Sequence, residues 1–135
     1  MNVSEKVLEF RIKLGLPVSP EPRMLTAEEA SFYARFVMEE LSEFLKAHES
    51  KDMAEAADAV VDLIYVMVGC AHHMGLPFNT LFNLVHNANM LKEPGETKRG
   101  IKADAIKPDG WAPPEEQIRK LLQNIQNNVY FFSET

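Results

Sequence analysis

The segment from Met53 to Met74 constrains the fold of this chain more than any other part of the sequence. Its residues are apolar on nearly every face of a helix, which is typical of a helix at the centre of a protein. Three acids interrupt it, Glu55, Asp58 and Asp62. A carboxylate at the middle of a membrane-spanning helix costs roughly 2.5 to 3.5 kcal/mol. The segment therefore predicts the buried helix of a soluble bundle and argues against a membrane span.

Helix-start and helix-stop signals divide the rest of the chain. Ser4 is the expected N-cap of a first helix, and Gly15 ends that helix. Thr26 opens a capping box with Glu29, since a hydroxyl and a glutamate three residues later satisfy two free amides reciprocally. These signals predict helices at about 4–14, 26–48, 53–74, 79–92 and 114–129.

Residues 93–114 separate the last two predicted helices and are rich in glycine, proline and charge. This composition predicts an irregular loop with a functional role rather than a linker, and strand signals are almost absent from the whole sequence. With 135 residues, of which 46% are hydrophobic, the chain suits one domain with a modest core. We therefore expect a single all-α domain over residues 1–135, a four- to five-helix bundle.

Composition excludes several classes of function. The net charge of −6 argues against a surface for DNA or RNA, because neutralising the phosphates of a polymer needs clustered lysine and arginine. The one cysteine, Cys70, has no disulfide partner and no zinc-ligand spacing, which favours a reducing compartment. The first residues lack the apolar run of a signal peptide. We expect a cytoplasmic protein that binds neither nucleic-acid polymers nor membranes.

Carboxylates occupy positions where the helical phase predicts apolar contacts. In the helix over 26–48, successive residues rotate by about 100°, which places Glu40 between Val37 and Phe44 on the inward stripe. Glu43 lies at the edge of this stripe, and Glu39 flanks its other side. An ionised glutamate among aromatic side chains is costly unless it is paired or bound to a metal.

The three acids of the helix over 53–74 fall within a wedge of roughly 60°. Gly69 continues this wedge and would let another group approach closely. If this helix and the one before it form an antiparallel pair, their acidic faces meet. Mg²⁺, which prefers oxygen ligands, is then the natural counter-charge. The alternative is that some of these acids are exposed, or that they pair with lysine and arginine at the surface.

A second set of polar residues suits phosphate groups. His86, Asn89 and Lys92 recur at spacings of three along one edge of the helix over 79–92. Asparagine offers amide donors and lysine a point charge. The following loop adds a local excess of cations, at Lys98, Arg99, Lys102 and Lys107. A solvated helix face has the same pattern, so this set by itself leaves both interpretations open.

Four motifs, in order along the chain, resemble the all-α NTP pyrophosphohydrolases of the MazG-like superfamily, which includes dimeric dUTPases and phosphoribosyl-ATP pyrophosphohydrolases. Residues 39–43, Glu-Glu-Leu-Ser-Glu, match the Glu-Glu-x-x-Glu signature. Residues 62–66, Asp-Leu-Ile-Tyr-Val, resemble the central helix. Residues 86–92, His-Asn-Ala-Asn-Met-Leu-Lys, and 107–111, Lys-Pro-Asp-Gly-Trp, resemble stretches of the dUTPase-like branch. The resemblance covers about Leu8 to Trp111.

This resemblance implies a homodimeric or homotetrameric enzyme that cleaves a nucleoside triphosphate, preferably a deoxynucleotide, to the monophosphate and pyrophosphate. The implied catalytic residues are Glu39, which would position or deprotonate the attacking water, with Glu40, Glu43 and Asp62. The implied ligands of Mg²⁺, or of Mn²⁺ in its place, are Glu40, Glu43, Asp58 and Asp62. The residues expected to contact substrate are Tyr65, Asn89, Lys92 and Lys107, with Phe10 and Phe36 against the base.

One position departs from the family pattern. The second motif of the family is Glu-x-x-Asp, and aligning it on Asp62 places Ala59 where the glutamate should stand. We expect Asp58 to replace the missing ligand, with Glu55 as the other candidate. The departure keeps two further hypotheses open: a relative with weakened or lost catalysis that binds a nucleotide or a metal, and a helical interaction module whose acids bind a basic partner.

Overall fold

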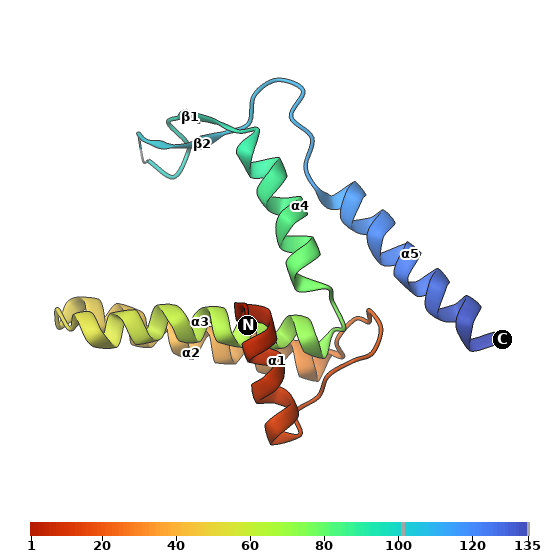
Figure 1. The fold of residues 1–135 in the computed structure, drawn as a ribbon. Helices are drawn as coiled ribbons and strands as arrows, with labels where there is room; N and C mark the ends of the chain where they lie inside the picture. Colours follow the sequence, from red (N-terminus) through yellow and green to blue (C-terminus); the bar gives the residue numbers. More distant parts are fainter. Residues whose placement is uncertain (101, 135) are drawn as a thin grey trace. The chain divides into compact units, whose positions relative to one another are not determined.

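The computed structural model describes residues 1–100 and 102–134, and it confirms the all-α class (Figure 1). The five described helices are α1 (Val3–Leu14), α2 (Ala27–Glu49), α3 (Met53–His73), α4 (Phe78–Met90) and α5 (Glu115–Glu134). Two three-residue strands, β1 (Glu93–Gly95) and β2 (Asp104–Ile106), lie between α4 and α5. No single described helix is long and apolar enough to cross a membrane, although α3 and α4 taken together would pass on length and composition alone.

The chain forms two compact units, Met1–Phe78 and Asn79–Thr135. The first holds α1, α2 and α3, and the second holds nearly all of α4 with the strands and α5. The single domain expected over residues 1–135 stays a prediction.

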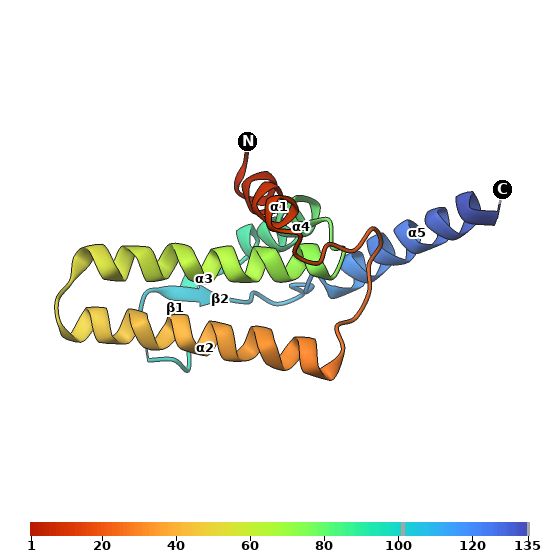
Figure 2. The same ribbon diagram turned by 90° about the horizontal axis from the view of Figure 1, so that it is seen from below.

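In the first unit, α2 and α3 form an antiparallel hairpin, and α1 crosses α3 (Figures 1 and 2). Asp52 caps α3, because its side chain accepts a hydrogen bond from the backbone N–H of Glu55. The antiparallel pair that the sequence predicts is therefore present. It brings the acidic faces of the two helices toward one another.

The helix caps confirm one prediction and correct another. Thr26 and Glu29 form the predicted capping box at the start of α2. At α1, however, Asn2 is the N-cap and exchanges hydrogen bonds with Glu5, so the assignment of Ser4 as the cap is wrong. Asn2 is the cap because Glu5 lies three residues after it, and the Glu5 side chain accepts a hydrogen bond from the Asn2 backbone amide. Ser4 is instead buried, where its backbone carbonyl oxygen lies 2.9 Å from His72 Nε2.

The core of the first unit lies where α1 crosses α3. Val7 and Val68 are almost completely buried, and α3 is buried continuously from Val68 to Ala71. Toward its N-terminus the same helix exposes large apolar side chains, Val61 at 58% and Ile64 at 51%. The prediction that α3 is buried all round therefore holds for its C-terminal end, while its N-terminal half keeps an exposed apolar face.

The proline-rich connection between α1 and α2 packs over the C-terminal end of α3. Backbone amides of Ser19 and Arg23 donate hydrogen bonds to the carbonyls of His72 and Met74. Gly75 makes this packing possible, because a Cβ at its position would stand 2.2 Å from the backbone oxygen of Glu21.

In the second unit, β1 and β2 pair antiparallel, with Glu93 opposite Ile106 and Gly95 opposite Asp104. Residues 93–114 are therefore not the fully irregular loop expected from their composition. The Asp104 carboxylate closes the turn, since it accepts hydrogen bonds from the Thr97 hydroxyl at 2.6 Å and from Arg99 Nε at 2.9 Å. These hydrogen bonds, Thr97 foremost, lower the pKa of Asp104 to about 2.

The contact at Gly75 gives a stability prediction with a matched control. Gly75→Ala and Gly15→Ala both place a side chain at positive φ, +68° and +66°, which costs roughly 1–2 kcal/mol each. Only Gly75 also faces backbone atoms, whereas nothing lies within 4 Å at Gly15. We expect Gly75→Ala to lower the melting temperature clearly more than Gly15→Ala, measured by circular dichroism. Equal losses would contradict the close packing of this connection.

Candidate active site

The acidic faces of α2 and α3 meet around two half-buried carboxylates, Glu40 on α2 and Asp62 on α3. Their neighbours Glu39, Glu43 and Asp58 are exposed. Glu40 Oε2 is fully buried, yet it has no hydrogen-bond partner among the residues that the structure describes. An unsatisfied buried carboxylate oxygen is costly, so this atom marks a place where a ligand or counter-ion is missing.

Neighbouring carboxylates act on the pKa of the two half-buried acids. Burial raises the pKa of Glu40 above its ordinary value, and the nearby Glu43, Asp62 and Glu39 carboxylates raise it further. Burial likewise raises the pKa of Asp62, with added repulsion from Asp58 and Glu43. Like charges in a partly desolvated space disfavour ionisation. Neighbouring acids of α2 and α3 thus act on the two half-buried carboxylates, while the site formed by all five acids stays a prediction.

The arrangement fits a hard divalent cation in its chemistry and only partly in its geometry. All the candidate ligands offer carboxylate oxygens, which suit Mg²⁺, and one of these oxygens is buried without a partner. Within residues 1–100 and 102–134, however, no three acidic, histidine or cysteine side chains are grouped so that they could hold one metal ion. Metal binding here therefore requires side chains of this cluster to rotate toward one another.

Ala59, which the resemblance aligns with the family glutamate, is buried at 2% exposure. Asp58 is exposed, and its charge acts on Asp62 from one turn earlier on α3. These observations favour Asp58 as the acid that accompanies Asp62.

An aromatic cavity of about 650 Å³ lies in the first unit, with walls from α1, α2 and α3. Tyr65, Phe10 and Phe36, which the sequence placed near the substrate, all line it. Phe10 and Tyr65 stack edge to face, with ring centroids 5.3 Å apart. Aromatic walls with few polar groups are typical of sites for small organic ligands.

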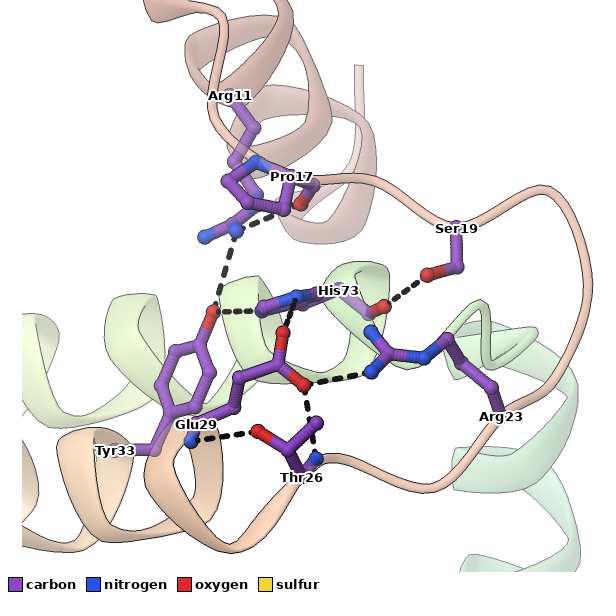
Figure 3. Close-up of polar contacts among 8 residues, drawn as sticks. All are labelled: Arg11, Pro17, Ser19, Arg23, Thr26, Glu29, Tyr33 and His73. Atoms are coloured by element: carbon purple, nitrogen blue, oxygen red, sulfur yellow. Dashed lines mark hydrogen bonds and ion pairs between the residues drawn. The ribbon is translucent and has the colours of Figure 1, made fainter.

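A chain of polar contacts forms one side of this cavity (Figure 3). Arg11 Nη2 donates to the Tyr33 hydroxyl at 3.2 Å, and that hydroxyl lies 2.9 Å from His73 Nδ1. On its other side, His73 Nε2 lies 2.9 Å from the Glu29 carboxylate, which also accepts from Arg23 at 2.6 Å. The hydrogen bonds from Arg23 and Thr26 lower the pKa of Glu29 to about 2.

The directions of these hydrogen bonds follow from the residues at the two ends of the chain, Arg11 and Glu29. Arginine can only donate and an ionised glutamate can only accept. Every group is satisfied when Tyr33 accepts from Arg11 and donates to His73 Nδ1, and when His73 donates from Nε2 to Glu29. Burial raises the pKa of the Tyr33 hydroxyl, which keeps its proton available for this bond.

Sequence reasoning missed this chain. Neither Tyr33 nor His73 carries a local sequence signal for such a contact, because the two lie on different helices, 40 residues apart. Arg11 carried one usable signal, because it follows Val7 by four residues and so shares the buried face of α1. The predicted close approach at Gly69 is confirmed, since Arg11 Nη1 lies 3.0 Å from where a Cβ of Gly69 would stand.

In the second unit, two of the predicted phosphate-binding residues gather on one ring. Lys92 Nζ and Lys107 Nζ each lie 5.1 Å from the centroid of Trp111. The indole is fixed by a hydrogen bond from its Nε1 to the carbonyl of Ala88 on α4, at 2.7 Å. Asn89, the third predicted residue, is exposed on α4.

The sequence profile of the phosphoribosyl-ATP pyrophosphohydrolase family matches residues 7–89 of this chain. The match covers every acid of the cluster together with Tyr65 and Asn89, while Lys92 and Lys107 lie beyond it. No curated protein matches the chain.

The strained carboxylate gives a prediction on pH and stability. Because the pKa of Glu40 is higher in the folded protein than its ordinary 4.5, the folded protein binds more protons between these two values. Stability should therefore fall as pH rises through this window. In metal-free buffer, Glu40→Gln should raise the melting temperature at neutral pH and flatten its decline as the pH rises above 4.5.

Glu49→Gln is the matched control, since it makes the same change at the exposed end of the same helix. It should leave both quantities as in the unchanged protein. A Glu40→Gln variant with an unaltered pH dependence would show that this carboxylate is not strained.

Proposed function

The chain belongs to the phosphoribosyl-ATP pyrophosphohydrolase family, within the MazG-like all-α NTP pyrophosphohydrolase superfamily, and we propose that it hydrolyses a deoxynucleoside triphosphate to the monophosphate and pyrophosphate with Mg²⁺. The family indicates a hydrolase of the pyrophosphohydrolase type that acts on a nucleotide substrate. The buried, unpartnered Oε2 of Glu40, facing the carboxylate of Asp62, is the single observation that carries the proposal.

We assign the metal to Glu40, Glu43, Asp58 and Asp62, with Mn²⁺ as a substitute for Mg²⁺. Mutual repulsion among these acids is the physical reason, because a divalent cation removes the cost that burial and like charges impose. When bound, the ion would offset the charge of the triphosphate and polarise its oxygens. All four acids are exposed or half-buried on helix surfaces, and we propose that side-chain rotation closes the ligand set.

Glu39 is the proposed base. It is exposed beside Glu40, so it can hold a water molecule without competing for the buried position. The water oxygen forms the new bond to the α-phosphorus, its proton passes to Glu39, and the bond from the α-phosphorus to the bridging oxygen breaks. Pyrophosphate leaves with that oxygen. Lys92 and Lys107, both held on Trp111, and Asn89 are proposed to bind phosphate oxygens.

A homodimer or homotetramer is also proposed. The hairpin of α2 and α3 exposes apolar side chains that a stable protein normally covers, among them Leu45 at 53% and Val61 at 58%. A second copy of the same hairpin would bury such a face.

The buried thiol of Cys70, whose pKa burial raises, fits a reducing cytoplasmic setting.

A weakened relative remains the second candidate, favoured by Ala59. Alanine has no carboxylate, so the cluster is one acid short of the family pattern, and Asp58 has a shorter side chain than glutamate. In that case the protein would bind the metal or the nucleotide, and it would hydrolyse the nucleotide slowly or not at all.

The activity prediction uses a panel of deoxynucleoside and nucleoside triphosphates with Mg²⁺, with inorganic pyrophosphatase and phosphate detection reporting pyrophosphate release. We expect turnover of at least one substrate, and a loss of about 100-fold or more in Glu40→Gln and Asp62→Asn, because each removes charge from the metal site. Glu49→Gln should retain full activity. Absence of release for every substrate would favour the weakened relative.

The ligand that replaces the missing glutamate can be identified by metal-dependent melting. Mg²⁺ bound only to the folded protein raises the melting temperature. This rise should be lost in Asp58→Asn and kept in Glu55→Gln, which makes an equivalent change one turn earlier. The reverse pattern would assign the ligand to Glu55, and no rise in the unchanged protein would support the interaction module instead.

A further inference from the structure

Arg11 is a buried cation without an anionic partner. Its side chain belongs to a residue only 7% exposed, and within the described chain its hydrogen bonds go to neutral groups alone. Nε and Nη2 both donate to the carbonyl of Pro17, at 3.0 and 2.7 Å, and Nη2 also reaches the Tyr33 hydroxyl. Burying a guanidinium without a carboxylate partner costs free energy, so other groups must offset part of this desolvation cost.

One nitrogen of this guanidinium remains available at the cavity. Nη1 makes no hydrogen bond to any residue that the structure describes, and it lies over Gly69, which has no side chain to cover it. Arg11 and Gly69 both line the aromatic cavity. The bonds to Pro17 and Tyr33 fix the guanidinium plane, so Nη1 is a donor held in a set direction rather than a mobile surface charge.

The other polar groups of this wall are already occupied. Tyr33, His73 and Glu29 are paired in the chain shown in Figure 3. Glu28 also lines the cavity, but it is exposed. Apart from the hydroxyl of the half-buried Tyr65, Arg11 Nη1 is therefore the side-chain donor of this cavity that has no partner among the described residues.

These features define the class of ligand. The walls carry the rings of Phe10, Phe32, Phe36 and Tyr65. They favour a planar ring, since aromatic groups stack face to edge or offset. A free phosphate fits poorly, because it is strongly hydrated and the wall also carries the anionic Glu28 and Glu29. A flat heterocycle with a hydrogen-bond acceptor at its edge satisfies both the rings and the donor.

We infer that this cavity holds the nucleobase and that Arg11 Nη1 donates a hydrogen bond to a ring carbonyl oxygen of the base. This inference rests on the proposed function. Arg11 is then a specificity-determining residue. It favours uracil, thymine and hypoxanthine, which carry such an oxygen, over adenine, which carries none. A hydrogen bond from a charged donor supports a discrimination of about 10- to 100-fold.

Binding is tested first without metal or phosphate, so that the result does not depend on hydrolysis. Melting temperatures are measured in chelator with deoxyuridine, thymidine, deoxyinosine and deoxyadenosine at equal, millimolar concentration. At least one of the three carbonyl nucleosides should raise the melting temperature more than deoxyadenosine does. An equal or larger rise with deoxyadenosine, or no rise with any nucleoside, would overturn the inference even if triphosphate hydrolysis is observed.

Two variants then address Arg11 itself. Arg11→Met removes the donor, and Gly69→Ala keeps it but adds a Cβ 3.0 Å from Nη1, which shifts the flexible end of the side chain. Gly69→Ala keeps the test valid if Arg11→Met does not fold. Both should abolish the preference for carbonyl nucleosides, whereas Lys13→Met, which removes an exposed charge from the same helix, should retain it.

Kinetics give the second readout. dITP and dATP differ at C6, where a carbonyl replaces an amino group, and in the proton that hypoxanthine carries on N1. For this pair, Arg11→Met should lower kcat/KM for dITP by about 10- to 100-fold and leave that for dATP nearly unchanged. A uniform loss for both substrates would show a structural role only and overturn the assignment. If the unchanged protein turns over no substrate but shows the nucleoside preference, that result would instead contradict the proposed function and support the base site.

Discussion

The antiparallel packing of α2 on α3 is the constraint on which the rest of the first unit depends. It sets Glu40 opposite Asp62 and so forces like charges into a partly desolvated space. A packed helix pair would ordinarily place apolar side chains at these positions, because an unpaired buried carboxylate lowers stability. Ala59, one turn before Asp62 on α3, is buried, whereas Val61 and Ile64 on the same helix are exposed. The folded state thus carries a local electrostatic cost that a cation can remove.

Local sequence signals determined most of the helices and some of their ends. The Thr26 capping box and the antiparallel pair of α2 and α3 follow from neighbouring residues, and both are present. Ser4 was the expected N-cap of α1, but Asn2 has the glutamate at the right spacing to close a capping box. The small sheet escaped prediction for a different reason. Its turn is closed by hydrogen bonds to the Asp104 side chain, and strand propensity gives no indication of them.

The site residues also differ in whether local sequence signals could predict them. Helical phase was enough to single out Glu40 and Asp62, since the period of a helix decides which face a residue occupies. The polar chain from Arg11 to Glu29 joins three helices, and its Tyr33 and His73 lie 40 residues apart in sequence. No local pattern encodes such a contact. Gly69 marks the boundary between the two cases, because its lack of a side chain predicted a close approach without revealing that Arg11 would make it.

Trp111 has a consequence for how this protein can be observed. It is the only tryptophan of the 135 residues, so intrinsic indole emission comes from the second unit alone. The ring lies beside two ammonium groups and donates to the carbonyl of Ala88, and nearby charges alter the energy of the indole excited state. Any event that draws Lys92 or Lys107 away from the ring would change the colour or yield of this emission. The fold therefore contains a spectroscopic reporter in its second unit, while the acidic hairpin, which holds no tryptophan, contributes nothing to the indole emission.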